Sequence, residues 1–371
     1  MRMWSLSSGI PMKLRVLLIL ALVVVVVLGG LAAYLTIRWI EAPVLSESDH
    51  PPAKIVVIPE GASFSQVAQL LEREQLIKSR AAFMWLGKKQ EAERKIRPGE
   101  YELHAALPPA EILSKLIAGR VLLHSVTIPE GYTISQIADV LAEHRITERA
   151  EFIRLAHDQS FAKSLGVPAE SLEGYLYPDT YRFPRPTAGK DVIKAMVDQL
   201  AHVLTSEWQV RAKEMRLTTH EVLTLASVIE KETGAGDERP HIASVFHNRL
   251  KRKIPLQSDP TVIYGLPNFD GNLRKNDLSH PSPYNTYRWA GLPPGPIASP
   301  GAGSIRAVLY PTSTSDLYFV SKNDGTHQFS ATLVEHNKAV EKYQKRSRSV
   351  RSSQTSVVPE KEIFTHQEGV S

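Results

Sequence analysis

The 371-residue chain contains no cysteine. It can therefore hold no disulfide framework, no thiolate metal site and no cysteine nucleophile. No GxSxG nucleophile elbow occurs, and His220-Glu221 lacks the second histidine of an HExxH zinc motif. A glycine-rich phosphate loop is missing as well. These absences disfavour serine, zinc and nucleotide chemistry, so we expect no metal and no cofactor.

Strong compositional bias is also lacking. Hydrophobic residues make up 43% of the chain and charged residues 22%, as in ordinary globular proteins, and the net charge is only +5. A mildly basic balance is compatible with an anionic polymer or a membrane surface. We expect no nucleic-acid partner. The length is sufficient for two domains with appendages.

One long hydrophobic run is present, residues 16–37, without a single charge. As a helix it spans about 33 Å, enough for the ~30 Å hydrocarbon core of a bilayer. Basic residues precede it, so the positive-inside rule places residues 1–15 in the cytoplasm and residues 41–371 outside. A cleaved signal peptide is the alternative, but its apolar region is usually only ~7–15 residues. We expect a single-pass anchor in the cytoplasmic membrane, with the rest of the chain on the extracytoplasmic side.

An internal repeat follows a polar linker, residues 38–53. IPEGASFSQVA at 58–68 matches IPEGYTISQIA at 128–138. Each copy predicts a strand, a Glu-Gly turn, a Ser or Thr cap and an amphipathic helix, with a second helix after it. Such units resemble LysM modules, which bind N-acetylated glycans; the alternative is that the repeat only fills a core. We group residues 54–165 as a LysM-like region, in which residues 97–120 add a strand and a helix.

The remaining chain, residues 166–345, predicts a domain of helices, short strands and ordered loops, so the fold class is α+β. Aromatic residues alternate between Tyr175 and Phe183, where they either pack in a core or wall a sugar cleft. We expect one helix from Asp191 to about Met215, and a later helix with a solvated Arg249. The stretches 255–265 and 282–301 are rich in proline, glycine and polar residues, which predicts shaped functional loops. Residues 346–371 are polar and aperiodic, and we expect them to be disordered.

The passage from Thr218 to Gly234 is the centre of this domain. Thr218 and Glu221 have capping-box spacing, and Gly234 is suited to end the helix. Two carboxylates, Glu230 and Glu232, stand in the last turn, where the helix dipole disfavours negative charge. Partial burial there raises a carboxyl pKa, as a general acid requires. The alternative is two solvated glutamates. One apolar face is expected, formed by Val222, Leu225, Ala226 and Ile229.

Four parts of this domain carry long, specific motifs: ASVIEKETG (226–234), RLKRKIPLQSDPTVIYG (249–265), SPYNTYRWAGLPPGPIASPG (282–301), and LYFV with HQFS (317–320 and 327–330). These stretches closely resemble the endolytic murein transglycosylases of the MltG/YceG type. The LEGYLYPDTY stretch, the anchor and the LysM-like region agree with them, so the resemblance runs from about residue 13 to residue 343. Members of this family cleave the β-1,4 bond between N-acetylmuramic acid and N-acetylglucosamine in nascent peptidoglycan. They leave 1,6-anhydro-muramyl ends and terminate glycan strand elongation. The resemblance implies peptidoglycan strands as substrate, and peptidoglycan synthases of the elongation or division machinery as partners.

The family's catalytic glutamate lies in a K-E-T triplet, which falls on Glu232. Glu230 and Glu232 project about 200° apart on the helix, so only one can point into a given cleft, and helical geometry alone does not decide which of them is catalytic. The resemblance implies that Glu232 is a general acid and then a general base. The loops also resemble those of lysozyme-like transglycosylases. The expected substrate-binding residues are Gln257, Asp259, Tyr264, Tyr284 and Asn285.

Two other functions remain open. A muramidase would need a second carboxylate about 5–10 Å from the first, and Asp259 is the candidate. A non-catalytic glycan-binding scaffold of the cell wall is the second alternative. The products released from peptidoglycan distinguish all three functions.

Overall fold

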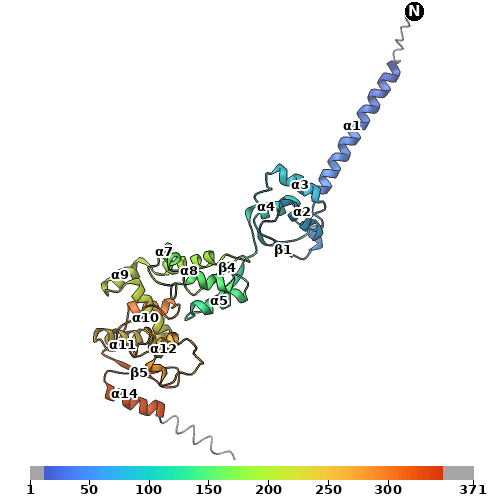
Figure 1. Cartoon of the computed structure of the whole chain (residues 1–371). Coiled ribbons are helices and arrows are strands. Elements are labelled where there is room, and N and C mark those ends of the chain that lie inside the picture. The colour runs from blue at the N-terminus through green and yellow to red at the C-terminus, as the bar shows by residue number, and fades with distance from the viewer. Residues whose placement is uncertain (1–11, 346–371) are drawn as a thin grey trace, which may run out of the picture. The chain divides into compact units, whose positions relative to one another are not determined.

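The computed structural model describes residues 12–345, and the chain divides into two compact units (Figure 1). The first unit runs to His124 and includes Pro184–Pro186. The second comprises Ser125–Phe183 and the chain from Thr187 onward. The two copies of the repeat therefore lie in different units, although the sequence suggested one region over residues 54–165. The N-terminal tip and the predicted disordered tail, residues 346–371, lie outside the described residues.

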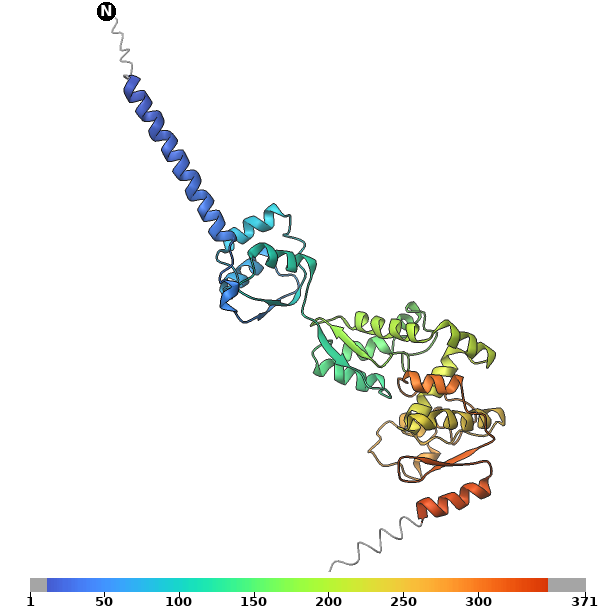
Figure 2. The same cartoon turned by 180° about the vertical axis from the view of Figure 1, so that it is seen from behind.

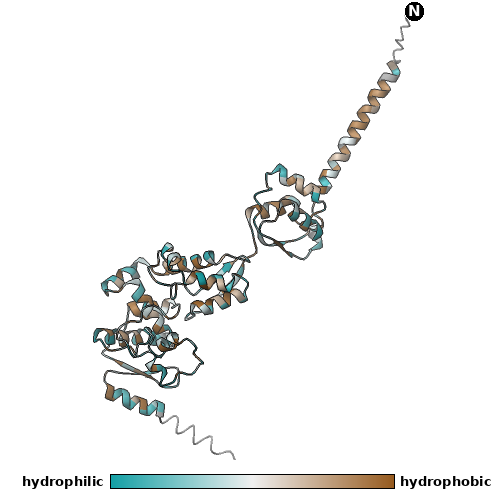
Figure 3. Cartoon of the chain, in the orientation of Figure 1, coloured by the Kyte–Doolittle hydropathy of each residue, from teal (hydrophilic) through white to brown (hydrophobic). Residues whose placement is uncertain are grey.

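The first unit begins with helix α1 (Met12–Glu41). Its side chains are hydrophobic along almost the whole length, which Figure 3 shows as a brown helix. The segment Val16–Glu41 is long and apolar enough to cross a membrane, and none of its most apolar stretch is buried in protein. A signal sequence has the same properties, so this helix is a candidate membrane span.

A small module follows α1 in the first unit. Strand β1 (Lys54–Ile58) pairs antiparallel with β2 (Gly99–Leu103), with Val56 opposite Tyr101. The serine cap predicted for the first repeat is present at Ser63, and Gln66 completes it as a capping box. The predicted strand and helix of residues 97–120 are confirmed by β2 and α4. Between and after the strands lie helices α2 (Phe64–Arg73), α3 (Arg80–Lys89) and α4 (Pro109–Ala118), with the 3-10 helix η1 (Glu47–Asp49) before β1.

The second unit opens with the other copy of the repeat. The predicted threonine cap is present at Thr133, and Gln136 again completes a capping box. Strand β3 (His124–Thr127) pairs with β4 (Thr180–Phe183). The repeated strand–helix–helix unit is therefore confirmed, and in both units a second strand and a further helix complete it. The helices here are α5 (Ile134–Glu143), α6 (Arg149–Ala156), α7 (Gln159–Ser164) and α8 (Gly189–Val203).

Helix α10 (Thr219–Glu232) lies at the centre of the second unit. It contacts its neighbours α9, α11, α12 and α13. The predicted capping box of Thr218 and Glu221 is present, and the predicted apolar face is buried. Every residue from Val222 to Ile229 is in fact buried, so the helix is covered on all sides. Those neighbours are α9 (Ser206–Glu214), α11 (Arg239–Lys251), α12 (Asp259–Gly265) and α13 (Ala302–Leu309).

The C-terminal part of the second unit is a hairpin covered by a helix, seen from behind in Figure 2. Strand β5 (Tyr318–Ser321) pairs antiparallel with β6 (His327–Ser330). Helix α14 (Leu333–Val340) contacts both strands. The short elements of this unit are the 3-10 helices η2 (Gly236–Glu238) and η3 (Asp277–Ser279) and the π-helix η4 (Glu341–Lys345).

The prediction of one helix from Asp191 to Met215 was wrong. The helix breaks after Val203, and the Thr205 hydroxyl accepts a hydrogen bond from the Trp208 N–H to start α9. Gly234 does not end α10 either. The residue after the helix is Thr233, which is extended, and its hydroxyl accepts a hydrogen bond from the Ala235 N–H. In both places threonine side chains set the boundary.

Two loop interpretations also need correction. Residues 259–265 form helix α12. Pro260 is in its first turn, where backbone N–H groups have no acceptor within the helix, so proline loses no hydrogen bond there. The aromatic side chains of the extended stretch are core residues, with Tyr175 and Phe183 buried. Tyr181 is half-buried and donates a hydrogen bond to the Tyr177 carbonyl at 2.6 Å. This stretch therefore packs in the protein and does not wall a sugar cleft.

Candidate active site

The C-terminal end of α10 presents its two glutamates to different surroundings. Glu230 is only 5% exposed and accepts a hydrogen bond from the Arg239 guanidinium at 2.9 Å. Its other oxygen accepts from the Gly301 N–H at 3.0 Å. Both oxygens are thus engaged in a buried ion pair and a backbone contact. Glu230 joins α10 to α11 and α13.

Among residues 12–345, Glu232 has no cationic hydrogen-bond partner. Its Oε1 accepts a hydrogen bond of 2.5 Å from the hydroxyl of Ser258, the residue that precedes α12. Burial raises the pKa of Glu232 to about 7, and the charge of Asp259 adds to the rise. The Ser258 hydrogen bond and the Arg249 charge oppose it. A carboxyl with this pKa can give and take a proton near neutral pH.

Asp259 and Tyr287 lie beside this carboxyl. The Tyr287 hydroxyl donates to Asp259 Oδ1 at 2.6 Å. Asp259 is exposed at the start of α12. Its charge raises the pKa of Glu232, and burial together with Asp259 raises that of the Tyr287 hydroxyl. The predicted second carboxyl is therefore present near Glu232, and it is already hydrogen-bonded to a tyrosine.

Arg249 fixes the loop that leads to Ser258, contrary to the prediction that it is solvated. It is only 7% exposed. Its guanidinium donates to the carbonyls of Leu317 at 2.6 Å and Leu256 at 2.8 Å. It also reaches the side-chain oxygen of Gln257 at 3.2 Å. This buried cation is satisfied by carbonyls and holds the loop in one conformation.

Gln257, a predicted substrate-binding residue, is exposed. Its φ of +53° is in the left-handed region, which is uncommon for a residue with a side chain. Its N–H donates to the Thr286 carbonyl at 3.1 Å. The unusual backbone conformation thus joins the 255–258 loop to the 282–289 loop. The Gln257 amide is left at the surface, where a ligand can reach it.

Tyr264 and Tyr284 come together, with ring centroids 4.8 Å apart. The Tyr264 hydroxyl donates to Glu173 at 3.3 Å. Tyr264 lines a cavity of about 580 Å³, and Tyr284 lines another of about 340 Å³. Glu173 borders both cavities. Lys231, next to Glu232 in the sequence, lines the larger one.

Asn285, a predicted substrate-binding residue, is buried within its own loop. Its side chain is 0% exposed. Its amide donates to the carbonyls of Leu278 and His280, at 3.0 and 2.8 Å. Its Oδ1 accepts from the Tyr287 N–H at 2.9 Å. Asn285 therefore shapes the loop that presents Tyr287.

The loop of residues 284–301 lies along α10 and is buried from Gly295 to Gly301. The Ile297 N–H donates to the hydroxyl of Ser227 in α10 at 3.0 Å. Ser299 exchanges backbone hydrogen bonds with the Glu-Gly turn of the second repeat. Gly301 lies against the Glu130 side chain, whose carboxylate would have to move to admit a Cβ at this position. The second repeat is therefore built into the unit that holds Glu232.

Several residues of this region were missed from the sequence, notably Glu173, Ser258 and Tyr287. Glu173 is 4% exposed and accepts a hydrogen bond from the Ile134 N–H at 3.1 Å. Burial raises its pKa to about 7. The only sequence signal for Glu173 was its position in the family-like motif LEGYLYPDTY. In that motif only the aromatic residues were considered as candidates for a sugar cleft. Within residues 12–345, no cluster of three or more His, Asp or Glu side chains could hold a metal ion.

The described geometry defines a site for acid–base chemistry by one protonatable carboxyl at the end of a buried helix. A model of the YceG-like family matches residues 56–342 of the chain. The chain therefore belongs to the YceG-like family.

Relatives and a solved structure agree with this assignment. An endolytic murein transglycosylase of Bacillus subtilis is 37% identical over 333 residues, 85% of this chain and 91% of that protein. An endolytic murein transglycosylase of Streptococcus pneumoniae is 31% identical over 77% of this chain, and the match spans 57% of the longer streptococcal protein. The 2.6 Å crystal structure of a putative yceG-like protein from Listeria monocytogenes superposes with a TM-score of 0.54 at 34% identity. That match covers 78% of this chain and 99% of the other.

Proposed function

We propose that this chain is an endolytic murein transglycosylase, a lyase that cleaves the β-1,4 bond between N-acetylmuramic acid and N-acetylglucosamine. The observation that supports this most is Glu232, a half-buried carboxyl at the end of α10 with a pKa of about 7. The relatives named endolytic murein transglycosylases add the substrate class. Glu230 is unsuited to the role, because its two oxygens are held by Arg239 and Gly301.

In the first step, protonated Glu232 gives its proton to the glycosidic oxygen. The bond between that oxygen and the muramyl C1 breaks, and the leaving sugar departs with a free 4-hydroxyl. In the second step, the Glu232 carboxylate takes the proton of the muramyl C6 hydroxyl as its oxygen attacks C1. The product is a 1,6-anhydro-muramyl end, and Glu232 is again protonated. One carboxyl is sufficient, because the nucleophile belongs to the substrate.

Ser258 positions the catalytic carboxyl in this proposal. Its hydroxyl donates to Oε1 of the ionised glutamate. The other oxygen, Oε2, is then the one that carries the transferable proton. Gln257, exposed on the same loop, and Tyr264 and Tyr284, beside the two cavities, are the proposed glycan contacts.

Cleavage within nascent strands would terminate their elongation, with peptidoglycan synthases as neighbours. Helix α1 would retain the enzyme in the cytoplasmic membrane, N-terminus inside, so that both units face the peptidoglycan. The LysM-like region would supply additional glycan contact. The apolar length of α1 supports the anchor, and the strand–helix–helix order of the repeat supports the resemblance to LysM modules.

A muramidase remains the second candidate because of one observation. Asp259 lies close enough to Glu232 to raise its pKa, as a second carboxylate of a hydrolase would. In that reaction water would attack C1, and the new muramyl end would be reducing.

The test is to incubate the full chain in detergent with purified peptidoglycan and to analyse the released muropeptides by mass spectrometry. Anhydro ends are expected. Reducing ends would replace the transglycosylase with a muramidase, and no release would leave a glycan-binding scaffold. Glu232→Gln should abolish release, with a loss of about 10²–10⁴-fold for a general acid. Asp237→Asn removes an exposed carboxylate five residues away and is the matched control, expected to act as wild type.

A further inference from the structure

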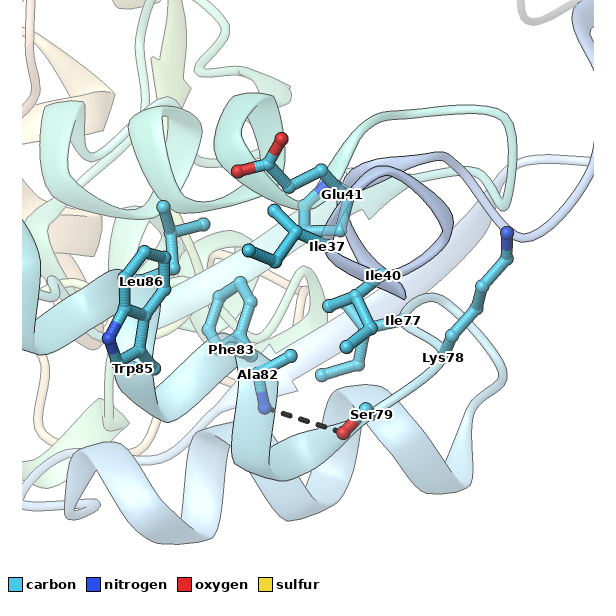
Figure 4. A pocket seen from close by; sticks show the side chains of 11 residues that line it. Ile37, Ile40, Glu41, Ile77, Lys78, Ser79, Ala82, Phe83, Trp85 and Leu86 are labelled. Atoms are coloured by element: carbon cyan, nitrogen blue, oxygen red, sulfur yellow. Dashed lines mark hydrogen bonds between the residues drawn. The ribbon is translucent and has the colours of Figure 1, made fainter. Parts of the chain in front are cut away.

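An apolar cavity of about 350 Å³ lies within the first unit, between the C-terminal end of α1 and helix α3. In Figure 4 side chains from both elements face this cavity, with those of α3 on one side and the end of α1 on the other. Polar groups occur mainly at its edge, where Glu41, Lys78 and Ser79 stand. Its apolar lining comes chiefly from Ile37, Ile40, Ile77, Ala82, Phe83 and Leu86.

The position of the cavity along α1 relates it to a bilayer, and here the inference rests on the proposed membrane anchor. The ~30 Å hydrocarbon core takes about 20 residues of helix. Counted from Val16, that length ends a few residues before Ile37. Ile37 and Ile40 line the cavity, so it opens at the outer boundary between acyl chains and headgroups.

The rim of the cavity has the chemistry of a membrane interface. Trp39 in α1 and Trp85 in α3 are 59% and 56% exposed. Lys78 Nζ lies 5.0 Å from the centroid of the Trp39 ring and donates to the Trp39 carbonyl at 3.1 Å. Lys89 Nζ lies 5.2 Å from the Trp85 ring. Exposed tryptophans, and lysines with long apolar stems, are typical of the headgroup level of a bilayer.

The charges around the rim favour an anionic partner. Lys88 and Lys89 are exposed at the end of α3, and Lys78 is half-buried at the rim. Glu41 is the opposing carboxylate among the lining residues. Lys78 and Glu41 balance each other in the lining, and Lys88 and Lys89 add positive charge at the end of α3, so a phosphate headgroup can lie over the mouth while its hydrocarbon enters below.

We propose that this cavity takes a segment of one acyl chain from an anionic phospholipid of the outer leaflet. The lipid is that of the membrane in which α1 lies, because α1 itself supplies part of the lining. The headgroup phosphate lies near Lys78, and Trp85, with Lys89 beside its ring, enters the interface. Helix α3 is then a membrane contact, and the first unit rests on the bilayer surface.

Close packing beneath α3 makes the cavity a fixed feature of the module. Phe83 stacks on Phe64 of α2 with ring centroids 5.5 Å apart. At Gly87 an added Cβ would lie 2.1 Å from the Phe64 ring, so α3 lies directly on α2. The exposed side of α3, which bears Trp85, is thereby held in one orientation.

The test uses the full chain in nanodiscs of phosphatidylethanolamine and phosphatidylglycerol that contain a phospholipid with a diazirine in its acyl chain. After illumination and proteolysis, mass spectrometry locates the labelled peptides. We expect label on α1 and on residues 80–89. Ala82→Asp places a carboxylate in the lining and should reduce the label on α3 about tenfold, because an acyl chain cannot solvate it. Ala82→Leu fills the cavity and should reduce the label without adding charge.

Ala81→Asp is the matched control, because Ala81 is exposed on the same helix and does not line the cavity. It should keep the wild-type label on α3. The proposal is overturned if α3 is labelled no more than β2 in the wild type, or if all three variants are labelled equally. Absence of label on α1 would overturn the anchor and this site together, whereas the muropeptide test of the proposed enzyme would be unaffected.

Discussion

The ionisation of Glu232 should lower the free energy of unfolding near neutral pH, where this carboxyl can both give and take a proton. Its folded pKa of about 7 lies above the ordinary value of 4.5. Between these two values the folded state binds more protons than the unfolded state, so the free energy of unfolding falls as pH rises. The shift corresponds to about 3 kcal/mol at about 1.4 kcal/mol per unit. This loss begins near pH 4.5 and is complete about one unit above pH 7.

Glu232→Gln should remove this pH dependence, because glutamine resembles the protonated acid. The variant will differ from wild type by some constant amount at pH 4. Between pH 4 and pH 8, the free energy of unfolding of the variant relative to wild type should rise by about 3 kcal/mol. Glu173 also has a raised pKa of about 7, but it is present in both proteins and cancels in the difference.

The measurement is urea unfolding of the full chain in detergent micelles at several pH values. Pulse-labelled hydrogen exchange on peptides of α10 reports the second unit alone, because Val222–Ile229 are buried there. Glu230→Gln is the control of opposite sign. It weakens the bond to Arg239 and should lose about 1.5–3 kcal/mol at neutral pH. A difference between Glu232→Gln and wild type that does not change with pH would refute the assigned environment of Glu232.

Two further predictions concern the surroundings of the site. Glu173→Gln should lower turnover, since Glu173 holds Tyr264 at the boundary of two cavities. The pKa of Glu232 should not change. An unchanged basic limb of the pH–rate profile would therefore distinguish this effect from damage to the catalytic acid. Pro293→Gly with Pro294→Gly should loosen the 284–301 loop and raise the fraction of reducing ends, as water reaches C1. An unchanged ratio of anhydro to reducing muropeptides in a folded, slower variant would exclude the loop as a water barrier.

Local patterns predicted much of the fold, because the groups that decide it are neighbours in the sequence. The capping boxes at Ser63, Thr133 and Thr218 each need only a partner three residues away. The antiparallel hairpin of β5 and β6 has equally local contacts. The helix starts at these three caps follow from spacing alone.

Arg249 shows why the rest was not predictable. On its helix it stands among polar residues, and nothing nearby indicates burial. Its principal partner is the carbonyl of Leu317, 68 positions away in the sequence. The burial of Glu173 similarly depends on the Ile134 N–H and on Tyr264. Such groups are satisfied only after distant segments pack, so their roles become visible in the folded structure.

The role of Asp259 distinguishes the two candidate reactions. If Asp259 is the base of a muramidase, Asp259→Asn should abolish activity at every pH. If Glu232 works alone, the same change removes a negative charge that raises the pKa of Glu232. The pKa then falls, and the basic limb of the pH–rate profile moves to lower pH while anhydro ends remain the product.

Tyr287→Phe provides the matched comparison for Asp259→Asn. It removes the hydroxyl that donates to Asp259 at 2.6 Å but leaves the carboxylate in place. Without that donor the Asp259 charge is less stabilised and its field at Glu232 is less screened, so the basic limb should not move to lower pH. The pH–rate profiles and muropeptides of both variants are compared with those of wild type. Complete loss in Asp259→Asn with a folded protein, and reducing ends as the wild-type product, would establish a hydrolase with two carboxylates. A displaced profile with unchanged products would leave Glu232 as the single acid and base, with Asp259 setting the pH at which it works.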